Sequence, residues 1–308
     1  MKILVTGGAG FIGSHVVDAF VHEGHDVLAV DDLSTGKTEN LNSGAPFRQV
    51  SILSDDFQKQ VEDFRPDVIC HHAAQIAVPA SVDDPLNDAQ RNVLGSLAVF
   101  EAARRYDVTK VINVSSGGAM YGEPVRVPCD EEHPVVPESP YGMSKYAAEL
   151  YLDLYHRLYG LDYTTLRYGN VYGPRQDPHG EAGVVAIFTE RMLRGQPCTI
   201  FGDGTQARDF VYVGDVVRAN LMALERGSGE ALNIGTGEPT TVNQVFEALA
   251  GAADYADDAN YADARPGEVY RIYLDVGRAA EVLGWRPEVT FVDGIERTVR
   301  SFTASGDA

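Results

Sequence analysis

Cysteine is scarce in this sequence. Only three cysteines occur in 308 residues, and Cys70, Cys129 and Cys198 lie far apart, without the paired spacing of zinc or redox motifs. An odd, dispersed set argues against a disulfide framework. We therefore expect reduced, mostly buried thiols and no metal site.

The sequence also has fewer basic than acidic residues, and it lacks long apolar runs. The formal net charge is −20, which disfavours nucleic-acid and anionic-membrane partners, so any phosphate must be bound locally. No segment reaches the roughly 20 apolar residues of a membrane-spanning helix, and the first residues do not resemble a signal peptide. We therefore expect a cytoplasmic protein. Two explanations of the acidity stay open, namely a high-salt habitat and a codon bias that favours Arg over Lys.

Apolar, β-rich runs alternate with amphipathic segments, which is the pattern of βαβ units around a parallel sheet. Strands are predicted at residues 2–6, 26–30, 47–50, 67–70, 110–114 and 163–167. Helices are predicted at residues 11–23, 83–106, 141–159, 184–193, 213–225, 241–250 and 276–283. The predicted fold class is α/β, a Rossmann-type doubly wound parallel sheet with a smaller C-terminal α/β substrate lobe.

A glycine-rich loop follows the first predicted strand and opens the first predicted helix. Gly7, Gly10 and Gly13 recur there at three-residue spacing. Glycine permits the tight turn and the close backbone approach that a pyrophosphate needs, and the helix N-terminus attracts the anion. Because strand, loop and helix come in the required order, the motif predicts a dinucleotide site rather than a simple turn.

Two carboxylates end the second predicted strand. Asp31 and Asp32 lie about 18 residues beyond the last glycine, where a carboxylate can accept hydrogen bonds from the adenosine ribose. Two negative charges would repel a 2′-phosphate, so NAD is predicted rather than NADP. The simpler role of capping the following turn fits Asp32 better than Asp31.

A Tyr-x-x-x-Lys pair lies in the predicted helix at 141–159. The spacing of Tyr141 and Lys145 places phenol and ammonium on one helix face. A free phenol has a pKa near 10, and we expect the ammonium, together with a positive nicotinamide ring, to lower it into the working range of a base. The pair is informative because it follows a dinucleotide loop and the strand that ends in Ser115 and Ser116.

Together these motifs resemble the extended short-chain dehydrogenase/reductase superfamily, and more narrowly the UDP-glucose 4-epimerase family. The stretches that carry the resemblance are residues 5–15, 31–36, 71–75, 115–122, 141–145, 167–174 and 265–268. The resemblance implies an NAD-binding Rossmann domain of residues 1–168 plus about 211–236. It assigns about 169–210 plus 237–308 to a nucleotide-sugar-binding lobe.

The family motifs imply cofactor or substrate contacts for individual residues of this chain. Cofactor contacts are implied for Gly7, Gly10, Phe11, Ile12, Gly13, Asp31, Asp32, Leu33, Ser34, Thr35, Gly36, Ser51, Ile52, Ala73, Ala74, Gln75, Asn92, Ser115, Tyr141, Lys145 and Tyr168. Substrate contacts are implied for Gly117, Gly118, Tyr141, Asn170, Val185, Phe201, Arg208, Arg265 and Glu268. Two guanidiniums can chelate a diphosphate inside an otherwise acidic protein. His71 and His72 end a buried strand and are expected to be structural.

The implied reaction interconverts UDP-glucose and UDP-galactose through a 4-keto sugar, with Tyr141 as acid and base and with Lys145 and Ser116 as the other catalytic residues. The family's dehydratases and decarboxylases carry acidic side chains where Gly117 and Gly118 stand. Neither glycine can transfer a proton, so elimination and decarboxylation are disfavoured. UDP-N-acetylglucosamine or UDP-glucuronate remain alternative substrates, and a non-catalytic NAD-binding sensor is a remote alternative.

Three positions depart from the family pattern. The family usually has Ser or Thr where Gly117 stands. The missing hydroxyl could be replaced by Ser116 or by a water, or Tyr141 could act directly on the sugar 4-hydroxyl. We expect direct action by Tyr141. Ser51 replaces the Asp that commonly binds the adenine amino group. Ile272, of intermediate size, leaves tolerance of N-acetyl groups open. The resemblance also implies a homodimer through the helices predicted at 83–106 and 141–159.

Overall fold

The computed structural model describes residues 1–179, 183–265 and 269–305. In these residues, seven parallel strands form one sheet in the order β11-β6-β5-β4-β1-β2-β3. The strands are β1 (Lys2–Thr6), β2 (Asp26–Asp31), β3 (Phe47–Gln49), β4 (Val68–His71), β5 (Lys110–Ser116), β6 (Asp162–Tyr168) and β11 (Glu230–Ile234). The order reverses between β1 and β4, which is where open α/β sheets bind ligands at their carboxyl ends.

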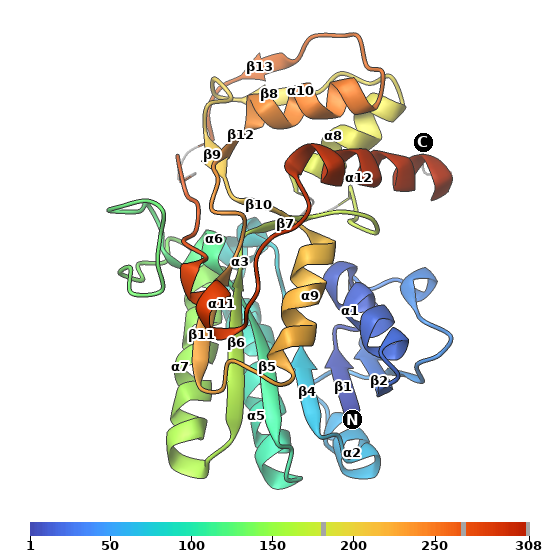
Figure 1. The fold of residues 1–308 in the computed structure, drawn as a ribbon, viewed down its shortest axis with the longest axis vertical. Coiled ribbons are helices and arrows are strands. Elements are labelled where there is room, and N and C mark those ends of the chain that lie inside the picture. The colour runs from blue at the N-terminus through green and yellow to red at the C-terminus, as the bar shows by residue number, and fades with distance from the viewer. Residues whose placement is uncertain (180–182, 266–268, 306–308) are drawn as a thin grey trace.

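Helices cover both faces of this sheet, as Figure 1 shows. One face packs against α1 (Phe11–His22), α9 (Val213–Ala223) and α11 (Gly277–Val282). The other packs against α2 (Asp55–Phe64), α5 (Gly95–Arg105) and α7 (Pro140–Tyr159). The central strands are therefore buried on both sides, which explains their continuous apolar runs.

The smaller lobe lies beyond the carboxyl ends of the strands, at the top of Figure 1. Its core forms between α8 (Val184–Leu193), α10 (Val242–Ala252) and α12 (Phe291–Ser305). Three short strand pairs complete it: β7 (Asn170–Tyr172) with β10 (Phe210–Tyr212), β8 (Thr199–Phe201) with β13 (Asn260–Ala262), and β9 (Ala207–Arg208) with β12 (Thr240–Thr241). The predicted fold class is confirmed.

The six predicted strands and seven predicted helices are all present, with ends shifted by a few residues. The helix predicted at 83–106 is continuous but is built from α4 (Pro85–Asp88), a π-helical segment η2 (Ala89–Leu94) and α5. The sequence interpretation missed α2, β11 and α12. Helix α12 could have been found, because Ile295, Val299 and Phe302 are buried at helical spacing.

The boundary between the lobes differs from the predicted partition in one segment. Residues 237–308 were all assigned to the smaller lobe, but Ala279, Leu283 and Trp285 pack in the core of the large sheet. The Trp285 indole also donates to the backbone oxygen of Asp215, at 2.9 Å. Burial of this apolar cluster holds α11 against the large sheet.

Candidate active site

The glycine loop packs too tightly to accept side chains. Gly7 has a φ of +68°, and a Cβ on it would lie 2.7 Å from the Ala73 nitrogen. A Cβ on Gly13 would lie 2.1 Å from the Gly7 carbonyl oxygen. Gly10 begins α1 with no side chain capping the helix, so the amides of the first turn face the cleft in front of them. Backbone amides at a helix N-terminus fit a pyrophosphate.

The aspartates at the end of β2 hold the loops around this cleft. The Asp31 carboxylate accepts hydrogen bonds from the amides of Ala9, at 3.0 Å, and Leu33, at 2.8 Å. Asp32 accepts from the Ser34 amide at 2.9 Å, as expected for a turn cap. Asp31 therefore ties the glycine loop to the next loop. An ionised carboxylate has about four acceptor positions, so it retains capacity for ribose hydroxyls.

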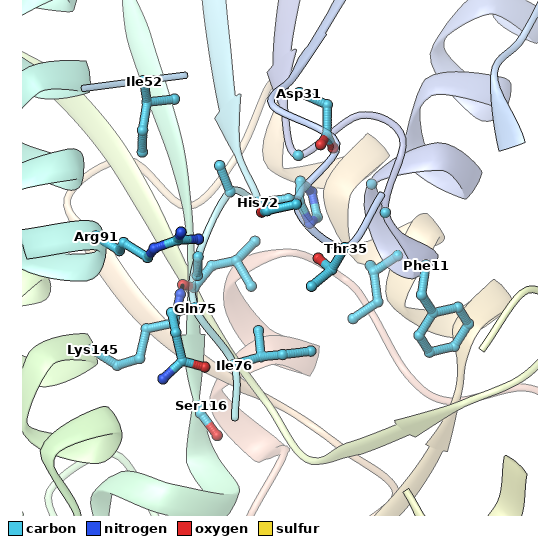
Figure 2. A pocket seen from close by; sticks show the side chains of 18 of the residues that line it. Phe11, Asp31, Thr35, Ile52, His72, Gln75, Ile76, Arg91, Ser116 and Lys145 are labelled. Carbon is cyan, nitrogen blue, oxygen red and sulfur yellow. Dashed lines mark hydrogen bonds between the residues drawn. The ribbon is translucent and has the colours of Figure 1, made fainter. Parts of the chain in front are cut away.

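A cavity of about 450 Å³ runs from these aspartates to the end of β5. We call it the cofactor cleft. Figure 2 shows Asp31 at one end of it, Ser116 at the other, and His72 and Gln75 between them. The predicted cofactor residues that line it are Gly7, Gly10, Phe11, Ile12, Gly13, Asp31, Asp32, Ser34, Thr35, Ser51, Ile52, Ala73, Ala74, Gln75, Ser115, Tyr141, Lys145 and Tyr168. The Ser115 hydroxyl oxygen is buried there with no partner among the described residues, as expected of a group that awaits a polar ligand.

Three predicted cofactor residues lie behind the cleft wall. Leu33 and Gly36 shape the turn after β2, since Leu33 has a φ of 61° and a Cβ on Gly36 would meet the Asp31 carboxylate. Asn92 is buried, and its amide bonds both backbone groups of Gln75, at 2.8 and 2.9 Å. Asn92 therefore positions the cleft wall.

Sequence interpretation overlooked Arg91, Ile76 and Gln176, which also line the cleft. Arg91 extends toward the cavity in Figure 2. It lies one residue before Asn92, and no sequence motif marks it. Its orientation is set by the π-helical segment η2, which changes the side-chain spacing of a regular helix.

Helix α7 presents the Tyr-x-x-x-Lys pair to the cleft. The helix begins at Pro140, and the Ser139 hydroxyl caps it by accepting the Gly142 amide at 3.1 Å. The Lys145 ammonium donates to the Val114 carbonyl at 3.0 Å, which joins α7 to β5. Both side chains line the same cavity, as the spacing predicted.

Burial dominates the electrostatics of the pair in the protein alone. Burial raises the pKa of Tyr141 to about 12, and interaction with the Ser116 hydroxyl offsets this only in part. Burial also lowers the pKa of Lys145 to about 8. Desolvation of both groups therefore dominates, because the cleft encloses them.

The two glycines after Ser116 do not line the cleft. A Cβ on Gly117 would lie 2.8 Å from the Leu274 side chain, so a serine would not fit there without a shift. A Cβ on Gly118 would lie 3.3 Å from the Asn170 amide oxygen. Ser116 lines the cleft, and its hydroxyl acts on the Tyr141 phenol. Of the three replacements for the missing hydroxyl, the geometry therefore supports Ser116 as a partner of the phenol.

A second cavity, of about 470 Å³, lies in the smaller lobe. We call it the lobe pocket. Asn170, Phe201, Arg208 and Arg265 line it as predicted, and the Arg265 guanidinium stacks over the Phe201 ring at 4.0 Å. Asn170 lines both cavities, so they adjoin at this residue.

Three other predictions concern this lobe. Val185 is fully buried in the core of the lobe, and its neighbours Val184 and Ile187 line the pocket. Glu268 lies outside the described residues. Ile272 is 1% exposed and packs in a cluster with Met120 and Tyr121.

The described part of the chain contains no helix long and apolar enough to cross a bilayer. Nor does it contain a group of three or more His, Cys, Asp or Glu side chains that could hold a metal. His71 is buried and His72 is half-buried at the cleft wall, and desolvation lowers the pKa of each to about 3, so both are neutral.

Residues 3–235 match the NAD dependent epimerase/dehydratase family. The chain belongs to this family. It is 48% identical to a UDP-glucose 4-epimerase of Mycolicibacterium smegmatis, over 98% of each chain. It is 52% identical to the UDP-glucose 4-epimerase of Thermotoga maritima, solved with UDP-glucose, with a TM-score of 0.97 over 99% of both chains. The corresponding Thermus thermophilus enzyme, solved with NAD, is 46% identical, with a TM-score of 0.95 over 99% of this chain and all of that one.

The packing of Gly13 in this family member gives a direct test of the cofactor cleft. Gly13→Ala is expected to weaken NAD binding by roughly tenfold or more and to destabilise the fold by about 1–3 kcal/mol, because the new Cβ meets a backbone oxygen. Calorimetric titration with NAD and denaturant unfolding measure the two effects. Gly251→Ala in α10 is the matched control, since a Cβ there meets nothing within 4 Å. Equal NAD affinity in both variants would contradict the steric account.

Ser116→Ala tests how the proton moves. We expect kcat to fall by about tenfold or less, the size of one lost hydrogen bond, because Tyr141 remains able to exchange the proton. Ser116→Thr, which keeps the hydroxyl, is the control. A Ser116→Ala enzyme without measurable turnover would instead make Ser116 the group that transfers the proton.

Proposed function

We propose that this chain is a UDP-glucose 4-epimerase that interconverts UDP-glucose and UDP-galactose, with a role in galactose metabolism. The observation that carries the proposal is that the two cavities adjoin at Asn170, and that Ser116 and Tyr141 line the cofactor cleft. A dinucleotide in the cofactor cleft and a UDP moiety in the lobe pocket would thus bring nicotinamide and sugar together at the phenol. Likeness to epimerases solved with UDP-glucose and with NAD supports both occupants.

The lobe pocket holds the substrate by its nucleotide end. Arg208 and Arg265 chelate the diphosphate, since guanidinium donors match phosphate oxygens in pairs. Phe201 lies beside the uracil, and Asn170 binds the substrate where the two cavities adjoin. Anchoring at one end leaves the hexose free to present either face to the cleft.

The cofactor cleft would hold NAD, which would supply a hydride acceptor and donor for carbon 4 of the sugar. The glycine loop binds the pyrophosphate, and Asp31 binds the adenosine ribose. Tyr141 removes the proton of the 4-hydroxyl. It returns the proton after the 4-keto sugar has rotated to present its other face. Because burial raises the pKa of Tyr141 to about 12, the phenol is protonated at neutral pH until a positive charge is bound nearby. Lys145 contributes to that positive charge.

The test is an assay without added reductant. Purified enzyme is incubated with UDP-glucose, UDP-N-acetylglucosamine or UDP-glucuronate, and products are separated chromatographically. UDP-galactose from UDP-glucose is the expected product. Faster conversion of another sugar would move the assignment to that substrate, and conversion of none would leave a non-catalytic NAD-binding protein.

We propose that the enzyme acts as a homodimer through the outer faces of α7 and of the continuous helix formed by α4, η2 and α5, on which Leu94 ends η2. Leu94, Met143, Leu150 and Leu158 are each more than half exposed, and those on α7 recur at helical spacing. Such a stripe on two adjacent helices fits pairing with a second copy. Sedimentation equilibrium should show twice 33.4 kDa, and Leu150→Glu should shift the mass to the monomer. A wild-type mass of one chain would refute the dimer.

The enzyme is proposed to be cytoplasmic. Its three cysteines are free and buried, which suits a reducing compartment. Labelling of all three thiols in unfolded protein prepared without reductant would support this. Oxidised thiols would contradict it.

A further inference from the structure

A third arginine lines the lobe pocket, and none of the family motifs described above includes it. Arg191 lies on α8 and borders the pocket together with Arg208 and Arg265. The described residues that line this pocket include these three guanidiniums and no carboxylate. Because a guanidinium only donates hydrogen bonds, such a lining suits a ligand that is rich in acceptors at both of its ends.

Helix α8 places Arg191 at the end of the lobe pocket that is remote from the cofactor cleft. Gly183, which immediately precedes α8, lines the cofactor cleft. Along the helix, the side that borders the lobe pocket carries Val184, Ile187 and Arg191. Arg191 lies eight residues after Gly183, which is about 12 Å along the helix axis at 1.5 Å per residue. The helix therefore spans the length of the pocket.

Arg208 lies at the opposite end. It comes two residues before Phe210, which pairs with Asn170 where β10 meets β7. The Asn170 amide also donates to the Asp209 carbonyl, next to Arg208, at 2.6 Å. Since Asn170 lines both cavities, Arg208 marks the end of the lobe pocket that adjoins the cofactor cleft.

Strand β8 connects the contact of Arg191 to the aromatic wall of the pocket. The Arg191 guanidinium donates to the Pro197 carbonyl at 2.9 Å, two residues before β8 begins at Thr199. Thr199 and Phe201 both line the pocket, as residues two apart on one face of a strand do. A base beside Phe201 therefore has Thr199 and Arg191 beyond it.

The chemistry of a pyrimidine then decides which of its groups reaches Arg191. With the diphosphate held at Arg208 and Arg265, the ribose of the nucleotide points toward that end and the base points away from it. Position 4 of the ring is opposite N1, which carries the ribose. This position is a carbonyl in uracil and an amine in cytosine. A guanidinium can donate to the carbonyl, whereas the amine offers it only further N–H groups.

We propose that Arg191 is a specificity residue that donates to the 4-carbonyl of the uracil and thereby selects uridine over cytidine nucleotides. Its bond to Pro197 holds the guanidinium at this end of the pocket and uses one of its five N–H donors, so capacity remains for a base. The proposal rests on the proposed function for the presence of a UDP moiety, and its main test measures binding rather than turnover.

Arg191→Met isolates the donors, because methionine keeps much of the apolar stem and cannot donate. Calorimetric titration with UDP and with CDP, which carry equal charge, separates recognition of the base from general attraction of the diphosphate. The wild type is expected to bind UDP roughly tenfold or more tightly than CDP, and Arg191→Met should lose most of this ratio through weaker UDP binding. Arg300→Met on α12 is the control, since Arg300 is exposed, pairs with Glu296 and does not line the pocket.

Arg191→Gln gives a second variant with a different expectation. Its side-chain amide has both a donor and an acceptor, so it can turn its oxygen toward the cytosine amine, and CDP binding should gain relative to UDP binding. Arg191 is exposed, so both variants are expected to fold. In turnover, Arg191→Met should raise KM for UDP-glucose and leave kcat nearly unchanged, because the base is remote from carbon 4.

The outcomes separate this proposal from the proposed function. A wild-type ratio of UDP to CDP affinity that persists in Arg191→Met would overturn the role of Arg191, while UDP binding and turnover would leave the epimerase assignment intact. Loss of the ratio in a protein that epimerises no sugar would uphold the role of Arg191 and refute the epimerase. A wild type that binds neither nucleotide would refute both.

Discussion

Replacing Tyr141 by phenylalanine is expected to reduce kcat by roughly 1,000-fold or more while substrate binding changes little. Phenylalanine fills the same space on α7 but cannot exchange a proton, and a positioned acid or base contributes about 100- to 10,000-fold to rate. The cleft offers Ser116 as the nearest hydroxyl, and its unperturbed alcohol is a poorer base than a phenol. Product formation from UDP-glucose measures the loss, and calorimetric titration with UDP measures retained binding.

Tyr151→Phe is the matched control for this experiment. Tyr151 lies on the same helix, is 40% exposed and does not line either cavity. It should keep wild-type turnover and stability. Should Tyr141→Phe retain a tenth of wild-type kcat, the proton would have to move through Ser116 or a water, and the assignment of Tyr141 as acid and base would fail.

The cofactor cleft was largely predictable because its determinants are local. The glycine loop, Asp31 and the Tyr141–Lys145 spacing each follow a strand or lie on one helix face, so short-range geometry fixes where they point. The strands of the sheet were predictable for the same reason, since their apolar runs are short and bounded by turns. Features that depend on neighbouring residues can therefore be predicted from the sequence alone.

Long-range packing determined what could not be predicted. Asn92 and Val185 were assigned to ligands but face inward, because the π-helical segment and the core of the smaller lobe decide which side of each helix is buried. The raised pKa of Tyr141 depends on enclosure by segments far apart in the chain.

A second such long-range element is the buried ion pair between Glu149 and Arg167. The Arg167 guanidinium meets Glu149 at 2.7 Å, with side chains only 8% and 6% exposed. It also donates to the Tyr121 hydroxyl at 3.0 Å and to the Glu131 carbonyl at 3.3 Å. The pair therefore joins α7, one turn beyond Lys145, to β6 and to the segment that follows Ser116.

Glu149→Gln is expected to lower the free energy of unfolding by about 3–5 kcal/mol, because it leaves the Arg167 cation buried without a counter-charge. Urea unfolding measures the loss. Glu296→Gln on α12 is the control, since its ion pair with Arg300 is exposed and should contribute at most about 1 kcal/mol. The double variant Glu149→Met with Arg167→Met should recover much of the loss, because removal of both charges also removes the cost of burying them. A single variant as stable as the control would show that water reaches Arg167 and that the pair does not hold α7 against the sheet.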